Sequence, residues 1–181
     1  MSHRFSPRQF GRDTGAASAV EFALLAPLML FILLGTFEIT RAFSVKRKVE
    51  ELATTVTRFV TRTDRVTQAD LASFVTASTA VMFPNATDNS VLKIIVQRID
   101  RKDDGAVVVW SYDWNARKGT SPGSASPFVP TEPSVIRTNV TYTHKVTFTS
   151  MLSSLNLSEF ELTASQQFVP DKLSPITSSG F

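Results

Sequence analysis

The stretch that decides the fold is AASAVEFALLAPLMLFILLGTFEI, which occupies residues 16–39. As an α-helix it would be roughly 36 Å long, enough to cross a hydrocarbon core of about 30 Å. Its uncharged part, from Phe22 to Phe37, is slightly short on its own, so residues 16–20 must also lie at membrane depth. A segment that is apolar on all sides is rarely a helix of a soluble domain, and we therefore predict a transmembrane helix.

A cleaved secretory signal peptide is an alternative for this segment. Such a peptide has a short apolar core that is followed by small residues at the cleavage site. After Phe37 the chain instead reads EITRAFSVKRK, which has no such small-residue pattern. We therefore expect the membrane helix to be retained.

On its C-terminal side the helix is expected to continue beyond the membrane. No Gly or Pro interrupts residues 36–66, and the apolar positions follow one face of an amphipathic helix. These positions are Val45, Val49, Leu52, Ala53, Val56, Phe59 and Val60. We predict one helix from about residue 17 to residue 62. Its first half lies in the membrane, and its second half packs one face on a soluble domain.

A second, shorter helix should follow. Thr67 and Asp70 have the spacing of a capping box, with Asp in place of the usual Glu. Pro84 and Asn85 are expected to end this helix. Its apolar face consists of Leu71, Phe74, Val75 and Met82.

Beyond residue 90 the pattern changes to the alternation of period two that is typical of strands. Residues 91–100 and 106–114 flank the turn signal Asp104-Gly105 and predict a hairpin. Trp110 and Trp114 share one face of the second strand, so we expect both in the core.

Residues 115–135 are rich in Pro, Gly and Ser and are expected to form a long surface loop. Further strands are predicted at 138–149 and 159–169. The predicted fold class is α+β, with a long N-terminal transmembrane-plus-amphipathic helix, a short second helix and a roughly four-stranded antiparallel sheet.

The chain is thus expected to have four parts. They are a basic leader (1–15), a transmembrane helix (16–39), an α+β domain (40–169) and a flexible tail (170–181). Lys and Arg outnumber Asp and Glu by ten to six in residues 1–65, whereas the remainder is nearly neutral. Basic residues beside a membrane helix are expected to contact anionic lipid headgroups. A nucleic-acid-binding protein would need a basic face on its folded domain, and none is predicted.

No motif for catalysis or ligand binding is visible. Because there is no Cys, disulfides, thiolate metal sites and cysteine nucleophiles are excluded. His144 lies on the apolar side of its strand and is interpreted as a half-buried structural residue. Asp100, Asp103 and Asp104 lack the spacing of a calcium loop and are assigned to a solvated hairpin turn. We predict a protein that is not an enzyme, with no metal, cofactor or small-molecule substrate.

Glu21 is the only charged residue between Thr14 and Phe37. A carboxylate at membrane depth is costly, and such residues usually have a partner or a function. Glu21 is therefore either an interface residue that reaches toward the headgroups or the partner of a positive group in another membrane helix. The second possibility gives a role to Pro27, which removes a backbone donor, and to Gly35, which permits close helix packing.

The segment GAASAVEFALLAPLMLFILLGTFEITRAF, residues 15–43, closely resembles the N-terminal signature of the TadE-like family. These are pilin-like proteins of the tight-adherence (Tad, or Flp) pilus machinery. The matching features are the small residues before Val20-Glu21-Phe22-Ala23-Leu24, then Pro27, a Leu-rich run, Gly35, Glu38 and Arg41. The rest of the chain agrees with the family only in length and pattern.

The resemblance implies a minor pilin or pseudopilin that assembles through its membrane helix. Its partners would be other pilin-like subunits, the inner-membrane assembly platform, membrane lipid and a prepilin peptidase. The family glutamate is expected to meet the N-terminal amine of a subunit in the assembly, and Glu21 occupies that position. Phe22, Pro27 and Gly35 are the other expected assembly residues.

The resemblance also implies cleavage of the leader on the cytoplasmic face, at Gly15, Ala16 or Ala17. In the family the cut commonly follows a Gly and leaves Glu as the fifth mature residue. Here a cut after Gly15 makes Glu21 the sixth residue, and a cut after Ala16 makes it the fifth. Both sites remain open.

The predicted function is that of a structural and assembly component of a Tad-type pilus. We expect one pass through a bacterial inner membrane, with the N-terminus cytoplasmic, the C-terminal domain periplasmic, and possible incorporation into an extracellular adhesive pilus. The alternative is a signal-anchored periplasmic binding or adhesion domain that does not polymerise.

Overall fold

The computed structural model describes residues 14–63, 65–120, 125–147 and 158–170. The chain forms two compact units, Met1–Arg41 and Ala42–Phe181. We call the second unit the head. Most of the expected leader (1–15) and almost all of the expected tail (170–181) lie outside the described residues.

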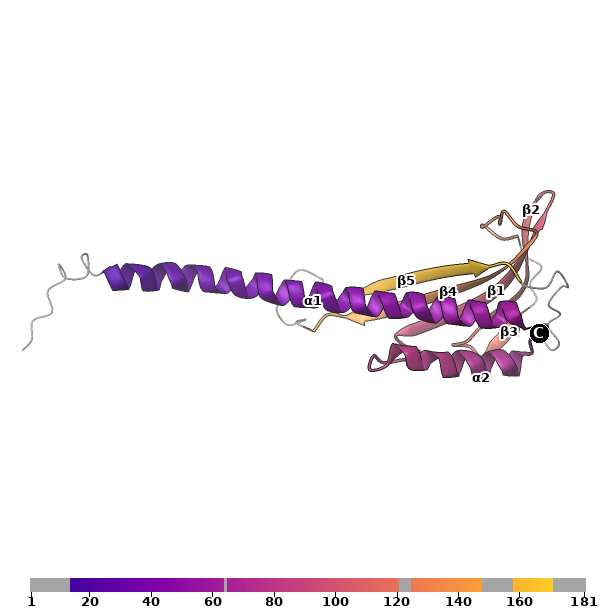
Figure 1. Ribbon diagram of the computed structural model, residues 1–181, viewed down its shortest axis with the longest axis horizontal. Helices are drawn as coiled ribbons and strands as arrows, with labels where there is room; N and C mark the ends of the chain where they lie inside the picture. The colour runs from indigo at the N-terminus through magenta and orange to yellow at the C-terminus, as the bar shows by residue number, and fades with distance from the viewer. Residues whose placement is uncertain (1–13, 64, 121–124, 148–157, 171–181) are drawn as a thin grey trace, which may run out of the picture. The chain divides into compact units, whose positions relative to one another are not determined.

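The first element is helix α1, which spans Thr14–Arg62 and has 49 residues (Figure 1). The prediction of one uninterrupted helix is therefore confirmed. Its most apolar window has a mean hydropathy of 2.2, and none of that window is buried. Among the described residues, α1 is the one helix long and apolar enough to cross a membrane.

Within the head, α1 packs against a second helix that runs in the opposite direction (Figure 1). Helix α2 spans Gln68–Ser78 and continues as a 3₁₀ turn, η2, over Thr79–Met82. The rings of Phe59 in α1 and Phe74 in α2 stack with centroids 3.4 Å apart. The predicted capping box is present, because Thr67 Oγ1 accepts from the Asp70 N–H and Asp70 accepts from the Thr67 N–H, each at 3.1 Å.

The rest of the head is a five-stranded antiparallel sheet with the order β3-β2-β1-β4-β5. The strands are β1 (Leu92–Lys102), β2 (Gly105–Asp113), β3 (Lys118–Thr120), β4 (Ser134–Lys145) and β5 (Glu159–Phe168). The α+β class is confirmed, but the expectation of four strands was one short. β3 lies in the region expected to be loop, where Lys118–Thr120 pair with the end of β2.

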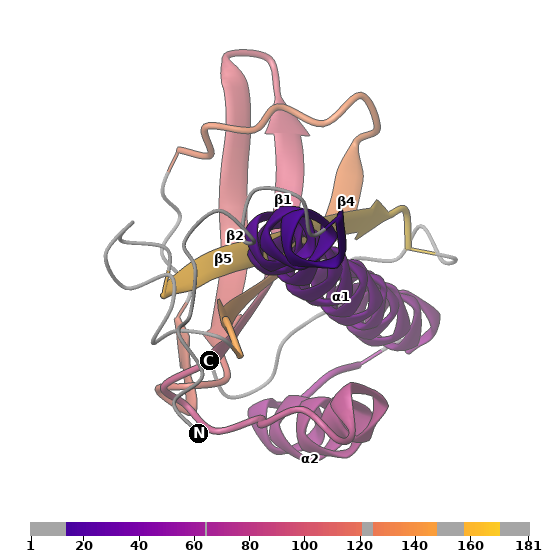
Figure 2. The ribbon, with the colours of Figure 1, turned by 90° about the vertical axis from the view of Figure 1, so that its left-hand side faces the viewer.

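Both helices cover one face of the sheet (Figures 1 and 2). The main core joins the apolar stripe of α1 and Leu71 and Val75 of α2 to inward residues of β1, β2, β4 and β5. Trp110 and Trp114 are buried in it, as predicted. His144, which is 3% exposed, also lies on this face, and its ring is 5.1 Å from that of Phe160.

A bulge changes the register between β1 and β2. Arg98 pairs with Trp110, but Ile99 pairs with Val108, so Val109 has no partner across the ladder. One extra residue in a strand turns the following side chains to the other face. In the half of the hairpin near its turn, the apolar side chains therefore point to the face of the sheet opposite the helices, and they are buried there.

These side chains form a second, smaller core that the loop after β3 covers. Ser126 N–H donates to the Ala106 carbonyl at 2.8 Å, and Ala125 forms a bridge with Val107. Phe128 then packs against the cluster. The cluster consists of Ile99, Ala106, Val108 and Val135.

Candidate assembly site on helix α1

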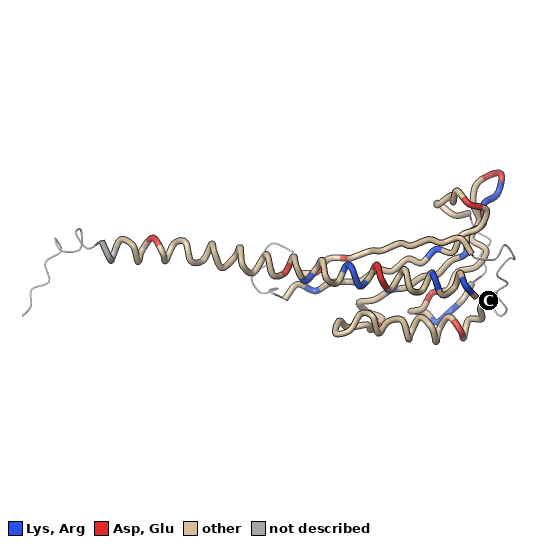
Figure 3. The backbone as a smooth tube through the Cα atoms, in the orientation of Figure 1, with Lys and Arg blue, Asp and Glu red and all other residues tan. Residues whose placement is uncertain are grey.

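The side chains of the apolar half of α1 are mostly exposed. Glu21 and Gly35 are exposed, Phe22 is 68% exposed, and Pro27 is exposed as well. Figure 3 shows that the charges of α1 are concentrated in its later part. A surface of this composition is stable only in lipid or against other apolar helices.

Helix geometry divides the four expected assembly residues between faces. At about 100° per residue, Glu21 and Gly35 lie about 40° apart around the axis and about 21 Å apart along it. Leu28 lies between them on the same strip. Phe22 and Pro27 point about 100° and 120° away from Glu21, in opposite senses. The structure therefore brings Glu21 and Gly35 onto one face and separates Phe22 and Pro27 from it.

Phe22 belongs to an apolar groove on a different side of the helix. The small side chain of Ala26 forms the floor of the groove, because its neighbours on that face are larger. The lining residues are Phe22, Ala26, Met29, Leu30, Ile32, Leu33 and Thr36. The sequence analysis did not predict this groove. The pattern that could have predicted it is a small residue, Ala26, surrounded at helical spacing by large apolar residues.

Gly35 leaves open space on the helix surface. A Cβ atom built on Gly35 would meet nothing within 4 Å. Within the described part of its own unit, no neighbour requires a Gly at this position. Small residues on a membrane helix let the backbone of another helix approach closely, so Gly35 is suited to contact a neighbour.

The polar groups at membrane depth are largely satisfied within the helix. Thr36 Oγ1 donates to the Ile32 carbonyl at 2.8 Å, and Thr40 Oγ1 donates to the Thr36 carbonyl at 2.8 Å. Pro27 removes one backbone donor, so the carbonyl four residues earlier, at Ala23, loses its usual partner. Glu21 has no hydrogen bond or ion pair within the part of the chain that the structure describes. Its carboxylate is available to another molecule.

The expected processing residues lie at the start of α1. Because the helix begins at Thr14, the backbone of Gly15, Ala16 and Ala17 belongs to its first turn. The amides of this turn have no partner within the helix, so it is the part that unfolds at least cost. Ala17 lies one turn before Glu21, whereas Ala16 is rotated by about a further 100°.

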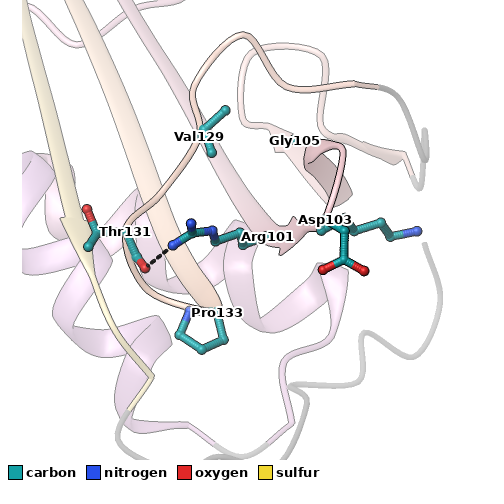
Figure 4. Close-up of a pocket in the computed structure, with 7 residues that line it drawn as sticks. Arg101, Asp103, Gly105, Val129, Thr131 and Pro133 are labelled. Atoms are coloured by element: carbon teal, nitrogen blue, oxygen red, sulfur yellow. Dashed lines mark hydrogen bonds between the residues drawn. The ribbon is translucent and has the colours of Figure 1, made fainter.

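The described residues also form a polar hollow at the distal end of the β1–β2 hairpin (Figure 4). The Arg101 side chain donates from Nη1 to the Thr131 carbonyl at 2.8 Å, and its backbone N–H donates to the Pro133 carbonyl at 2.8 Å. Arg101 thus holds the loop against the hairpin. The other lining residues are Lys102, Asp103, Gly105 and Val129.

The three aspartates of the hairpin do not behave alike. Asp103 and Asp104 are exposed in the turn, as expected. The assignment of Asp100 to a solvated turn was wrong, because Asp100 accepts from Arg98 Nε and Nη2 at 2.9 Å each and from Ser134 Oγ at 2.7 Å. Arg98, only 6% exposed, occupies an inward position in the alternation of β1, and that position is the signal that could have predicted the pair. Among the residues described, no group of three or more His, Cys, Asp or Glu could hold a metal ion.

The fold and the site together define an α+β protein whose one long helix is shared between a head and an apolar segment that is long enough to anchor the chain in a membrane. Residues 16–58 match the family model described as "TadE-like protein". The match confirms the resemblance over this segment and indicates a minor pilin-like protein associated with the Tad pilus. A search of curated proteins and a search of solved structures gave no match.

Proposed function

We propose that this chain is a minor pilin or pseudopilin that acts as a structural and assembly component of a Tad-type pilus. The observation that supports this most is the contrast within α1. One face of its later part is buried against a sheet, whereas its earlier part exposes a mostly apolar surface that carries the carboxylate of Glu21. Such a surface needs lipid and neighbouring helices as its environment.

In this proposal Glu21 forms an ion pair inside the membrane. An unpaired charge at the centre of a membrane helix costs on the order of 2.5–3.5 kcal/mol on insertion scales. A pairing partner on another subunit recovers much of that cost, so the charge favours assembly. The partner is the N-terminal amine of a processed subunit, and the head stays in the periplasm.

The spacing between Ala17 and Glu21 supports this pairing. If Ala17 is the first mature residue, its amine lies about 40° from Glu21 around the helix and about 6 Å below it. The amine and the carboxylate then lie on one strip of α1. When two neighbouring helices are offset along their axes, the amine of one can pair with the Glu21 carboxylate of the other. A chain starting at Ala16 places the amine about 140° away from Glu21.

The test is replacement of Glu21 in the native host. Glu21→Gln keeps the size of the side chain and removes its charge, and Glu21→Leu also removes the insertion cost. Both variants should reach the membrane at wild-type levels or above, but should be depleted from sheared filaments and from cross-linked complexes with other pilin-like proteins. Glu51→Gln, which changes an exposed acid in the head part of the same helix, is the matched control and should assemble normally.

Normal assembly of both Glu21 variants would leave Glu21 as an interface residue only. A protein that is anchored in the membrane but never appears in filaments or pilin complexes would instead support a periplasmic binding or adhesion domain that does not polymerise.

A further inference from the structure

The C-terminal end of α2 lies at the end of the head where the chain enters at Ala42. Helices α1 and α2 run in opposite directions (Figure 1), and the rings of Phe59 and Phe74 stack between them. Lys48 Nζ donates to the backbone carbonyl of Phe83, which fixes the segment after η2 beside the earliest part of α1 in the head. Phe83 is 80% exposed.

The start of β5 lies at the same end. Arg58 lies over the ring of Phe168, with its guanidinium carbon 5.5 Å from the centroid, which places the end of β5 near Arg58. Phe160 precedes Phe168 by eight residues, or about 26 Å of strand. Phe43 precedes Arg58 by a comparable length, about 22 Å of helix. Helix α1 and strand β5 run in the same direction (Figure 1). Phe43 and Phe160, which precede the Arg58–Phe168 contact by similar lengths, therefore lie toward one end of the head.

Every exposed Phe of the described head lies at this end. Phe43 is 62% exposed and Phe160 is 40% exposed. The remaining described Phe side chains of the head, at positions 59, 74, 128 and 168, are partly buried. We call Phe43, Phe83 and Phe160 the aromatic end.

The charges around the aromatic end are of both signs: Glu159 and Glu161, on either side of Phe160, are exposed, and basic residues lie near Phe43. Lys46 and Arg47 are exposed on the turn of α1 that follows Phe43. The Ser90 hydroxyl and the Ser90 backbone N–H both donate hydrogen bonds to the carboxylate of Asp88. These hydrogen bonds lower the pKa of Asp88, and the hydroxyl has the larger effect. Aromatic side chains and basic residues together are typical of segments at the membrane–water interface.

We propose that the aromatic end of the head inserts into the interfacial layer of the leaflet from which α1 emerges. The occupant of this surface is the bilayer, because the chain enters the head at Ala42, directly after the apolar segment. The proposal rests on α1 spanning the membrane, which is part of the proposed function, but not on assembly into a pilus. Three Phe contacts with lipid hold the head in one orientation before it meets other subunits.

The test is tryptophan fluorescence of the full-length chain in vesicles of phosphatidylcholine with a minor share of phosphatidylglycerol. The vesicles contain lipids brominated either near the headgroup end or near the methyl end of the acyl chains. The native Trp110 and Trp114 are buried in the head, so the wild-type signal is subtracted as background. The probes are Phe83→Trp, Phe160→Trp, Leu30→Trp in the apolar segment, and Val129→Trp, an exposed control on the distal loop.

We expect the Phe83→Trp emission to shift to shorter wavelength and to lose more intensity to the shallow bromines than to the deep ones. Phe160→Trp should behave similarly and provides a second position if Phe83→Trp lowers the folded fraction. Val129→Trp should not be quenched. If Leu30→Trp is quenched while both aromatic-end probes behave like Val129→Trp, the proposal is wrong, but the insertion of α1 into the membrane is supported. If Leu30→Trp is not quenched, both the anchor and the proposal are wrong.

Discussion

At the residue scale, the capping box of α2 shows how a short sequence signal becomes a measurable contribution to stability. Thr67 and Asp70 are exposed enough that their effect comes from hydrogen bonds to the helix end rather than from burial. Replacing Thr67 by Ala removes the hydroxyl that accepts from the Asp70 amide. We expect Thr67→Ala to lower the free energy of unfolding by about 1 kcal/mol, measured by urea denaturation in detergent.

Asp70 makes the same cap dependent on pH. The Thr67 hydroxyl and then the Thr67 N–H donate to its carboxylate and lower its pKa below the ordinary value of 3.8. A carboxyl group with a lower pKa in the folded state stabilises the fold above its unfolded pKa, and this contribution disappears as pH falls through the folded pKa. The difference in unfolding free energy between wild type and Asp70→Ala should therefore be larger at neutral pH than in acid below the folded pKa. A constant difference across that range would contradict the assignment.

Tyr112 carries a buried hydroxyl that has no hydrogen-bond partner among the described residues. An unsatisfied buried hydroxyl costs about 1–3 kcal/mol, so Tyr112→Phe should leave the free energy of unfolding unchanged or raise it by up to about 1 kcal/mol. Burial also raises the pKa of the Tyr112 phenol. The control is Trp114→Phe, which loses the hydrogen bond from Nε1 to Thr76 Oγ1 at 3.2 Å and should be destabilised. A clear loss of stability in Tyr112→Phe would mean that the hydroxyl is satisfied.

At the scale of elements, long periodic patterns were predictable and local exceptions were not. The helical stripe of α1 and the alternation in β1, β2 and β4 extend over many residues, so single exceptions do not obscure them. The bulge at Val109 leaves the alternation of buried residues in β2 intact while changing the face to which they point. No sequence pattern distinguishes that case from a regular strand.

The short strand β3 and the second core were missed for a related reason. Residues 115–135 have the composition of a loop, and three residues of pairing are too few to produce a periodic signal. The loop is held by contacts with distant residues, such as the Arg137 guanidinium carbon 4.7 Å from the ring centroid of Phe128. Contacts of this kind become visible only when the register of the sheet is known.

The candidate site could be predicted in its residues but not in its arrangement. Glu21 stands out in the sequence because a carboxylate is costly at membrane depth, and Pro27 and Gly35 stand out because they interrupt a run of large apolar residues. That Glu21 and Gly35 share a face follows from helix geometry, once the helix is known to continue through Pro27.

This shared face leads to a prediction for α1. Gly35→Leu places a large side chain on the strip of Glu21, where nothing in the described chain opposes it. The variant should fold and insert normally but associate less with other membrane helices, because close backbone approach is lost. The measurement is energy transfer between labelled chains in vesicles. Ala26→Leu, about 180° away on the helix, is the matched control. Equal loss in both variants would mean that Glu21 and Gly35 do not mark the contact face.

At the scale of the whole molecule, the two units have different requirements. The head has a packed core of its own, whereas the apolar part of α1 has no buried core among the residues that the structure describes. Stability measurements on the head therefore report on folding, and measurements on the apolar segment report on membrane insertion and assembly. Variants at the two kinds of position should affect these readouts separately.

The orientation of the chain in the membrane is the prediction on which the proposed function depends most. Basic residues do not decide it, because three precede the apolar segment and four lie within the eleven residues after Phe37. A long domain can cross the membrane despite nearby positive charge. We expect the head outside the cytoplasm, because the proposed pilin function requires it there. Because the chain has no Cys, single cysteines can report on each side without background.

Val129→Cys, at a position that is 53% exposed, should react with a membrane-impermeant maleimide in intact spheroplasts. Ser6→Cys, in protein made without a prepilin peptidase, should react only after the cells are lysed. The reverse pattern would place the head in the cytoplasm, where it could not join an extracellular filament, and the pilin proposal would then be wrong. Labelling at both positions in intact cells would show that the spheroplasts leak, and a cytoplasmic marker protein with a known cysteine controls for that.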